Sequence, residues 1–249
     1  MPSKFYQTGS ERAAKVEDLF ATVAPRYDLI NDLQSLGMHR LWKRKFLSMA
    51  SVQTGERALD VCCGTGDVAL ALANKGAKVT GADFSEPMLA VARHRAEAQA
   101  EARVERPSFQ QADALNLPFP SGSFDVVTIA YGLRNLADFD RGLTELTRVL
   151  APGGRLLVLD FGIPENPLWR SLYFAYLGKI APLFGRWFCG DGDTHAYILD
   201  SLKAYPAQRG VDAWMRSHGM TGVRLANIMG GAMSINYASK PAAPSRSAG

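Results

Sequence analysis

The stretch that decides the fold reads Ala58-Leu-Asp-Val-Cys-Cys-Gly-Thr-Gly-Asp67. Its apolar start predicts a buried strand, and the glycine-containing turn leads directly into a helical pattern over 68–73. A strand, a tight glycine turn and a helix in this order are how α/β proteins hold a nucleotide-like ligand against backbone N–H groups at the helix N-terminus. Gly64 and Gly66 allow close backbone approach, and we expect the Asp60 carboxylate, at the strand end, to face the ligand crevice.

The turn alone does not identify the ligand. Gly64-Thr65-Gly66-Asp67-Val68-Ala69 also fits the G-x-G-x-x-G/A pattern of dinucleotide-binding proteins. A nicotinamide-dependent reductase is therefore an alternative, and the cofactor must be identified from the rest of the chain.

Length and composition are those of an ordinary α/β protein. The 249 residues, 47% of them hydrophobic, supply enough apolar material for a single core. The net charge of +4 includes no dense Lys/Arg block, so we expect no nucleic acid partner. Three cysteines, two of them adjacent, give neither a disulfide framework nor a Cys-x-x-Cys metal site. We expect no metal, no signal peptide and a reducing, cytoplasmic setting.

Strand and helix patterns alternate from residue 55 to 160. Strands are expected over 58–61, 78–83, 108–112, 124–130 and 155–160, and helices over 68–73, 85–103 (N-cap Ser85) and 138–150. This alternation predicts right-handed crossovers and an open parallel sheet, with a turn at Pro152-Gly153-Gly154. Two final runs, 223–228 and 232–238, predict an antiparallel hairpin joined by Gly230-Gly231. The expected fold is α/β and Rossmann-like, a mostly parallel seven-stranded sheet with a C-terminal antiparallel hairpin.

Other segments lie outside this alternation. A single domain is expected to span 11–238, between disordered residues at 1–10 and a flexible tail at 239–249. Within it we expect a helical lid over 11–50, a cofactor-binding core over 55–160 and an aromatic substrate cap over 165–205. The cap is expected to end in a helix at 197–205, and a further helix is expected at 211–218. Seven aromatic residues and three cations lie in 168–188, which is too charged and interrupted to span a bilayer. This stretch suits either a tunnel for an apolar substrate tail or the membrane surface.

Three acids lie at three successive strand ends. They are Asp60, Asp83 and Asp113. Because the carboxyl ends of parallel strands line the ligand crevice of an open sheet, we expect the three carboxylates to lie near one another. Asp83 follows the glycine turn at the distance expected of a carboxylate that binds ribose hydroxyls, which suits NAD and S-adenosylmethionine alike.

Four stretches resemble class I methyltransferases. They are Leu59-Asp60-x-x-x-Gly64-x-Gly66, Ala112-Asp113-Ala114 with Leu117-Pro118-Phe119, Phe124-Asp125-Val126-Val127, and Leu150-x-Pro152-Gly153-Gly154-x-Leu156. The first carries an acid that a plain dinucleotide fingerprint lacks, and the second resembles the loop on the adenine side of the cofactor. This resemblance implies S-adenosylmethionine as the cofactor.

Other stretches are similar to signatures of the UbiE/MenG family, the C-methyltransferases of ubiquinone and menaquinone biosynthesis. These are Phe20-Ala-Thr-Val-Ala-Pro-Arg-Tyr27-Asp28-Leu-Ile-Asn31-Asp32, Gly37-Met-His39-Arg-Leu-Trp42-Lys-Arg44, Tyr131-Gly-Leu-Arg134-Asn135 and Asp191-Gly-Asp193-x-x-x-Tyr197. The resemblance covers residues 15–238. Cys62-Cys63 departs from it, since the family usually has Ala or Gly there; we expect two small turn residues and not nucleophiles.

The resemblance implies roles for individual residues. Cofactor contacts are implied for Thr65, Asp83, Asp113 and Ala114, with Asp60, Gly64 and Gly66 in or beside the turn. Asp83 would accept hydrogen bonds from the ribose hydroxyls and Asp113 one from the adenine amino group. The Arg134 cation would stabilise a phenolate, and Asn135 would orient the quinol oxygen. His39, His195, Asp191 and Asp193 are candidates for the general base.

The implied reaction is methylation of a ring carbon of a polyprenylated quinol. The substrate would be demethylmenaquinol or the 2-polyprenyl-6-methoxy-1,4-benzoquinol of ubiquinone biosynthesis, and the sequence does not decide between them. A methyltransferase acting on another small molecule is the nearer alternative, because fold does not fix substrate. We expect a cytoplasmic protein with peripheral contact to the inner face of the membrane, and the sequence leaves a homodimer open.

Overall fold

The computed structural model describes residues 32, 35, 37–99, 105–180, 199, 201–202 and 205–243. Its strands are β1 Arg57–Val61, β2 Lys78–Asp83, β3 Ser108–Gln111, β4 Phe124–Ala130, β5 Leu150–Phe161, β6 Thr221–Ile228 and β7 Met233–Ser239. Its helices are α3 Met38–Ala50, α4 Asp67–Ala73, α5 Glu86–Ala98, α6 Phe139–Val149, α7 Pro167–Ala175 and α10 Ala207–Ser217. Three single turns, η2 Leu133–Asn135, η3 Tyr176–Ile180 and η4 Met229–Gly231, complete the described elements.

The strands form one seven-stranded sheet in the order β3-β2-β1-β4-β5-β7-β6. β1 to β5 pair in parallel, whereas β7 runs antiparallel to both β5 and β6. The turn η4 joins β6 to β7 through Gly230 and Gly231, whose φ angles of 65° and 97° favour glycine. The predicted fold class and C-terminal hairpin are confirmed.

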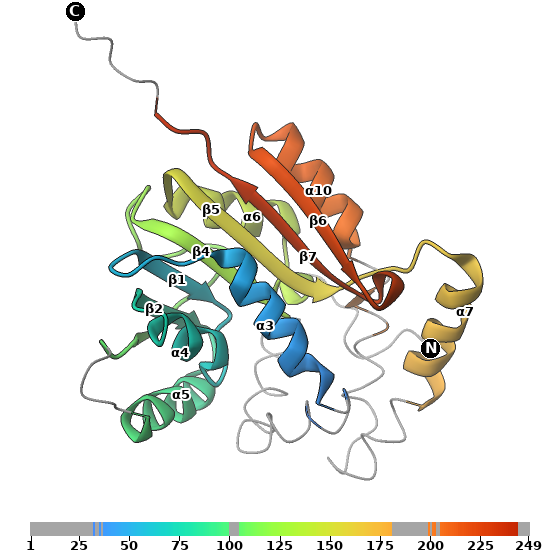
Figure 1. The fold of residues 1–249 in the computed structure, drawn as a ribbon, viewed down its shortest axis with the longest axis horizontal. Helices are drawn as coiled ribbons and strands as arrows, with labels where there is room; N and C mark the ends of the chain where they lie inside the picture. Colours follow the sequence, from blue (N-terminus) through green and yellow to red (C-terminus); the bar gives the residue numbers. More distant parts are fainter. Residues whose placement is uncertain are drawn as a thin grey trace, which may run out of the picture.

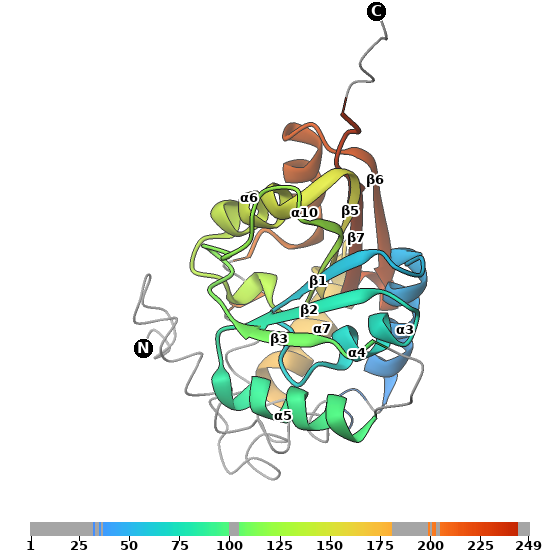
Figure 2. The ribbon, with the colours of Figure 1, turned by 90° about the vertical axis from the view of Figure 1, so that its left-hand side faces the viewer.

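Helices cover both faces of the sheet (Figures 1 and 2). α3 and α4 lie on one face and α6 and α10 on the other, while α5 flanks the β2–β3 edge. β4 and the segment 156–159 of β5 are nearly continuously apolar, as expected of strands whose two faces are both covered. On the α3 side, Phe46 and Ala50 are fully buried against the sheet.

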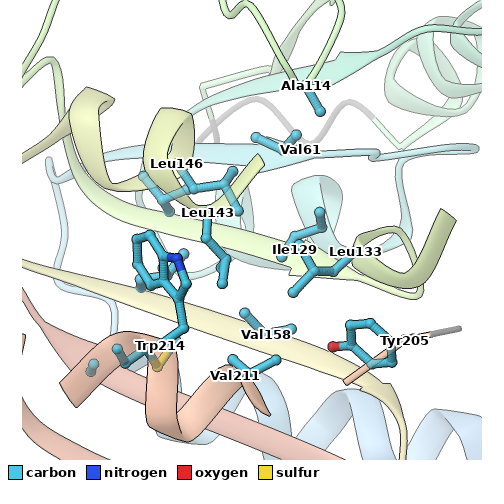
Figure 3. Close-up of a cluster of buried hydrophobic side chains, with 14 of the residues drawn as sticks. Val61, Ala114, Ile129, Leu133, Leu143, Leu146, Val158, Tyr205, Val211 and Trp214 are labelled. Carbon is cyan, nitrogen blue, oxygen red and sulfur yellow. The ribbon is translucent and has the colours of Figure 1, made fainter. Parts of the chain in front are cut away.

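The second core cluster lies between the sheet and the helices α6 and α10 (Figure 3). Trp214 of α10 approaches Leu143 and Leu146 of α6, and Val158 of β5 lies in the same cluster. The Trp214 indole Nε1 donates to Asp140 at 2.6 Å, so the ring has a polar partner at the edge of the core. This packing fixes the carboxyl end of β4, from which the loop toward η2 departs.

Several predicted boundaries are wrong. The helix predicted over 85–103 ends at Ala98, and Ser85 occupies its N-cap position without a capping hydrogen bond from its side chain. The helix predicted from Val211 begins four residues earlier, at Ala207, because Pro206 cannot continue a preceding helix but suits a helix start.

The region around Pro152-Gly153-Gly154 is also different from the prediction. It lies inside β5, which begins at Leu150, and not in a turn before the strand. The ladder shifts there, since Phe124 pairs with Leu150 but Val126 pairs with Arg155, so the intervening residues bulge out with Gly153 at a φ of 78°.

The predicted start of the flexible tail, residue 239, is too early. β7 extends through Ser239, and the Lys240 ammonium donates to the carbonyls of Thr147 and Leu150, both at 2.8 Å. These bonds fasten the end of β7 to the α6–β5 junction.

The lid and the aromatic cap are described only in part. α3 confirms a helix at the end of the predicted lid, and its Leu41 is 56% exposed. The rest of 11–31 and residues 181–198 lie outside the described residues. Of the helix predicted over 197–205, only Leu199, Ser201, Leu202 and Tyr205 are described. Within the described ranges no helix is long and apolar enough to cross a membrane.

Candidate active site

The site lies where the strand order changes direction, between β1 and β4. In open α/β sheets this switch point, at the carboxyl ends of the strands, is where ligands bind. The glycine turn 62–66 follows β1 there, and the loop 131–135 follows β4. The two segments touch: a Cβ placed on Gly132 would lie 2.5 Å from the Cys62 Cβ. Position 132 therefore has no room for a side chain, and Cys62 joins the two loops.

The two turn glycines serve different purposes. Gly64 has a φ of 54°, and no described atom lies within 4 Å of where its Cβ would be. Gly66 has a φ of 84°, but its Cβ would meet Ala92 and Phe109, both at 3.1 Å. Gly64 therefore presents open backbone toward the site, whereas Gly66 lets α5 and β3 pack against the turn.

Both cysteines of the turn are packing residues. Cys63 lies beside Gly81 of β2, where an added Cβ would be 3.0 Å from its sulfur. Burial raises the pKa of both thiols well above the ordinary value, so neither forms a nucleophilic thiolate at neutral pH. The predicted role as small turn residues agrees with this environment.

Asp83, at the end of β2, holds the turn from one side. Its Oδ2 accepts from the Gly64 N–H at 2.8 Å, and its Oδ1 accepts from the Ser85 N–H at 2.9 Å. Burial raises the pKa of Asp83, and these backbone donors oppose the rise. Because each carboxylate oxygen has two acceptor sites, Asp83 retains capacity for a ligand hydroxyl.

Asp113 and Ala114 follow β3. The Ala112 N–H donates to the Asp83 carbonyl at 3.0 Å, which brings this loop beside the end of β2. The exposed Asp113 accepts from the Leu115 N–H at 2.8 Å. Ala114 is 6% exposed and belongs to the same core cluster as Val61 (Figure 3). The structure thus brings Asp83 and Asp113 to one edge of the sheet, as predicted.

Asp60 is not placed as predicted. Its side chain is buried, and Oδ1 accepts from the Thr128 hydroxyl on β4 at 2.8 Å. Burial raises the pKa of Asp60 to about 7. The hydrogen bond from Thr128 and the nearby Lys43 charge act in the opposite direction and lower this pKa. The carboxylate is therefore enclosed between β1 and β4 instead of facing an open crevice.

The amide donors predicted around Thr65 are partly engaged within the turn. The Gly64 N–H donates to Asp83, and the Gly66 N–H donates to the Cys63 carbonyl at 2.9 Å. Thr65 itself is buried, and its carbonyl and hydroxyl oxygens accept from Arg95 at 3.0 and 3.1 Å.

Arg134 and Asn135 lie in η2, directly after β4. The Arg134 guanidinium Nη1 donates to Asp160 at 2.7 Å and to the Tyr131 carbonyl at 2.6 Å, and its carbon lies 4.7 Å from the Phe161 ring centre. Asn135 donates to the same Tyr131 carbonyl at 3.2 Å. Tyr131 has a φ of 60°, an uncommon conformation for a non-glycine residue, and these donors hold it.

Asp160 is a site residue that the sequence analysis did not assign. Asp160 lies one residue before the end of β5 and is 1% exposed. Its carboxylate also accepts a hydrogen bond from the Arg134 backbone N–H at 3.1 Å. Arg134 is therefore one half of a buried ion pair. The strand-end rule that selected Asp60, Asp83 and Asp113 applies equally to Asp160 and could have identified it.

The candidates for the general base are placed only in part. His39 is buried on α3, where its Nδ1 lies 2.8 Å from the Ser35 hydroxyl, and burial lowers its pKa. Asp191, Asp193 and His195 lie outside the described residues, as do Tyr27, Asp28 and Asn31 of the lid.

This fold is that of the class I methyltransferases. A solved structure with the same architecture is phosphoethanolamine N-methyltransferase 2 of Haemonchus contortus, in complex with phosphomonomethylethanolamine and S-adenosylhomocysteine. The TM-score is 0.62 at 19% identity, over 80% of this chain and 52% of that one. The chain thus spans about half the length of that enzyme, and the likeness concerns the fold alone.

Sequence comparison identifies the family. The model of the ubiE/COQ5 methyltransferase family matches residues 7–240. The demethylmenaquinone methyltransferase of Thermus thermophilus is 43% identical over 226 residues, 90% of this chain and 100% of its own. The ubiquinone/menaquinone biosynthesis C-methyltransferase UbiE of Azotobacter vinelandii is 41% identical over 235 residues, 93% and 92% of the two chains.

The chain belongs to the ubiE/COQ5 methyltransferase family, and it is an enzyme that uses S-adenosylmethionine. The resemblance drawn from the sequence motifs is confirmed. The alternative of a nicotinamide-dependent reductase is wrong.

The burial of Asp60 predicts an unusual dependence of stability on pH. Between pH 4 and 7 the folded protein holds a proton at Asp60 that the unfolded chain releases, so Asp60 makes the fold less stable as the pH rises. Asp60→Asn removes this dependence and can still accept from Thr128. We expect the unfolding free energy of the variant, relative to the parent, to increase by up to about 4 kcal/mol from pH 4 to 7.5 in urea titrations without ligand.

Asp125→Asn is the matched control. Asp125 lies on the neighbouring strand β4, and its hydrogen bonds from Arg57 lower its pKa. The relative stability of this variant should therefore stay flat above pH 5. A flat profile for Asp60→Asn as well would contradict the prediction.

Proposed function

We propose that the protein transfers the methyl group of S-adenosylmethionine to a ring carbon of a polyprenylated quinol. Demethylmenaquinol is the favoured substrate, and the 2-polyprenyl-6-methoxy-1,4-benzoquinol of ubiquinone biosynthesis is the second. The observation that carries the proposal is the match to the full length of a relative named demethylmenaquinone methyltransferase, at 43% identity. The switch point, with its glycine turn and charged loop, gives this chemistry a place in the fold.

The residues of the glycine turn fit the cofactor. S-adenosylmethionine carries its methyl group on a positively charged sulfur and supplies that methyl as an electrophile. The open backbone at Gly64 allows close approach of the ligand. Asp83 would accept from the ribose hydroxyls and Asp113 from the adenine amino group, with Thr65 and Ala114 beside them.

The loop after β4 would serve the quinol. A quinol carbon becomes nucleophilic when a neighbouring hydroxyl loses its proton, but phenols titrate near pH 10, so the site must favour the phenolate. The Arg134 guanidinium, held by Asp160 and the Tyr131 carbonyl, is a fixed donor that can stabilise the developing negative charge. Asp160 neutralises part of this charge, so the role that we propose for Arg134 includes directed hydrogen bonding. Asn135 would orient the quinol oxygen.

Methyl transfer to a defined quinol tests the function. The purified protein, S-adenosylmethionine with a labelled methyl group and reduced demethylmenaquinone in detergent micelles should give labelled menaquinol by mass spectrometry. The oxidised quinone is the matched control, because it has no hydroxyl to ionise and should not react. Tight cofactor binding without label in either quinol would refute the proposed substrate class and favour another small molecule.

Arg134→Met tests the role of the loop. We expect kcat to fall by about 100-fold or more, with S-adenosylmethionine affinity changed less than about threefold, because the residue acts on the quinol. Since the single change leaves Asp160 buried without its ion pair, the double variant Arg134→Met/Asp160→Asn is measured alongside it. Arg209→Met removes an exposed ion pair with Glu165 and is the control. Equal losses of turnover and cofactor affinity would mean that Arg134 only anchors the loop.

The exposed face of α7 fits a membrane surface. Leu168 and Leu172, four residues apart, are 72% and 56% exposed, and Ile180 is 45% exposed. Arg170 and Lys179 lie on the same exposed segment. α7 stands away from the sheet, beyond the carboxyl end of β5 (Figure 1). Leucines beside cations suit the interface of an anionic bilayer, where a polyprenylated substrate resides. We propose peripheral docking there.

Vesicle flotation tests this contact. Leu168→Glu/Leu172→Glu should abolish co-flotation with anionic phosphatidylglycerol vesicles at low salt, because each change places an acid at the interface. Leu41→Glu on α3 is the matched control, since Leu41 is as exposed as Leu172 but lies on another helix. Equal flotation of both variants, or no flotation of the parent, would contradict the proposed surface.

A further inference from the structure

Three charged side chains from three helices meet at the first residue of α4. Lys43 of α3 donates to Asp67 Oδ2 at 2.7 Å. Arg95, near the end of α5, donates to Asp67 Oδ1 at 2.5 Å. Asp67 follows Gly66 directly, so the network lies immediately behind the glycine turn.

Arg95 extends this network into the turn itself. Besides pairing with Asp67, its guanidinium donates to both the carbonyl and the hydroxyl of Thr65. One planar side chain thus spans Thr65 and Asp67 and fixes the backbone on both sides of Gly66. A guanidinium is suited to this task because its donors have a rigid geometry.

The network is shielded enough to hold the turn. The side chains of Lys43, Asp67 and Arg95 are 14%, 28% and 26% exposed. They are therefore more buried than the fully exposed ion pairs that contribute little to stability. Burial alone would raise the pKa of Asp67, but the two cations lower it overall, so Asp67 is ionised at neutral pH. Lys43 also opposes the rise in the pKa of Asp60.

The turn is therefore fixed from two sides. Asp83 holds Gly64 from the β2 side, and Arg95, paired with Asp67, holds Thr65 from the helical side. Both sets of contacts therefore act on the backbone that flanks the open face at Gly64. Lys43 adds α3, whose C-terminal half is anchored to the sheet by Phe46 and Ala50 and by Arg155, which donates to the Ala50 carbonyl at 2.6 Å.

We propose that Lys43, Asp67 and Arg95 are positioning residues that hold the glycine turn in its cofactor-binding shape, and that Lys43 makes α3 a structural part of the cofactor site. The part of this proposal that concerns methyl transfer rests on the proposed function, whereas the part that concerns the shape of the turn does not. The three residues act on cofactor affinity through the backbone of the turn, and they leave the reacting groups untouched.

Binding of S-adenosylhomocysteine to the full-length protein tests the proposal. Lys43→Met, Asp67→Asn and Arg95→Met should each weaken binding in calorimetry by about fivefold to twentyfold, and should raise the KM for S-adenosylmethionine while kcat at saturation stays within about twofold. Lys45→Met on α3 and Arg93→Met on α5 are the matched controls. Lys45 is exposed, and Arg93 pairs with Glu86, so both should bind as the parent does.

A double-mutant cycle separates positioning from a general loss of stability. Because Lys43 acts through Asp67, Lys43→Met should weaken binding in the parent but by less than about twofold in Asp67→Asn. Affinities of all three single variants within twofold of the parent, or a loss confined to kcat, would overturn the proposal. Failure of the parent to bind S-adenosylhomocysteine would instead refute the cofactor assignment, and binding without quinol methylation would refute only the proposed substrate.

Discussion

The contact between Cys62 and Gly132 is the constraint on which the site depends. It joins the glycine turn after β1 to the loop after β4 across the point where the strand order changes direction. A side chain at position 132 would push the two loops apart, and with them the open face at Gly64 and the Arg134–Asp160 pair. Cys62, one of the two cysteines that depart from the family pattern, is thus packed directly against Gly132.

Much of the fold could be predicted from local patterns. The alternation of strand and helix, the glycine turn and the final hairpin all have signals within a few residues, and the structure confirms them. Two of the errors arose where a residue far away in the sequence determines the local structure. The bulge at Gly153 depends on pairing with β4, and Lys240 is fixed by carbonyls of Thr147 and Leu150. No local pattern records either interaction.

The site was predictable to the same extent. The strand-end rule correctly predicted that Asp83 and Asp113 lie at one edge of the sheet, because parallel strands bring their carboxyl ends together. The burial of Asp60 and the pairing of Arg134 with Asp160 follow from register and loop geometry, which the sequence does not display. The link from Lys43 to Arg95 through Asp67 joins three helices, so the sequence pattern of a single segment does not predict it.

The place of β7 has a consequence for how the chain folds as it is synthesised. β7 lies between β5 and β6, and it follows both of them in the sequence. Until β7 has been synthesised, the backbone N–H and C=O groups along the edge of β5 next to β7 have no strand to pair with. An unpaired apolar strand is a template for association with other chains. The strands β1 to β5, which carry the glycine turn, all precede β7 in the chain, so this edge of β5 is open to association with other chains until β7 is made.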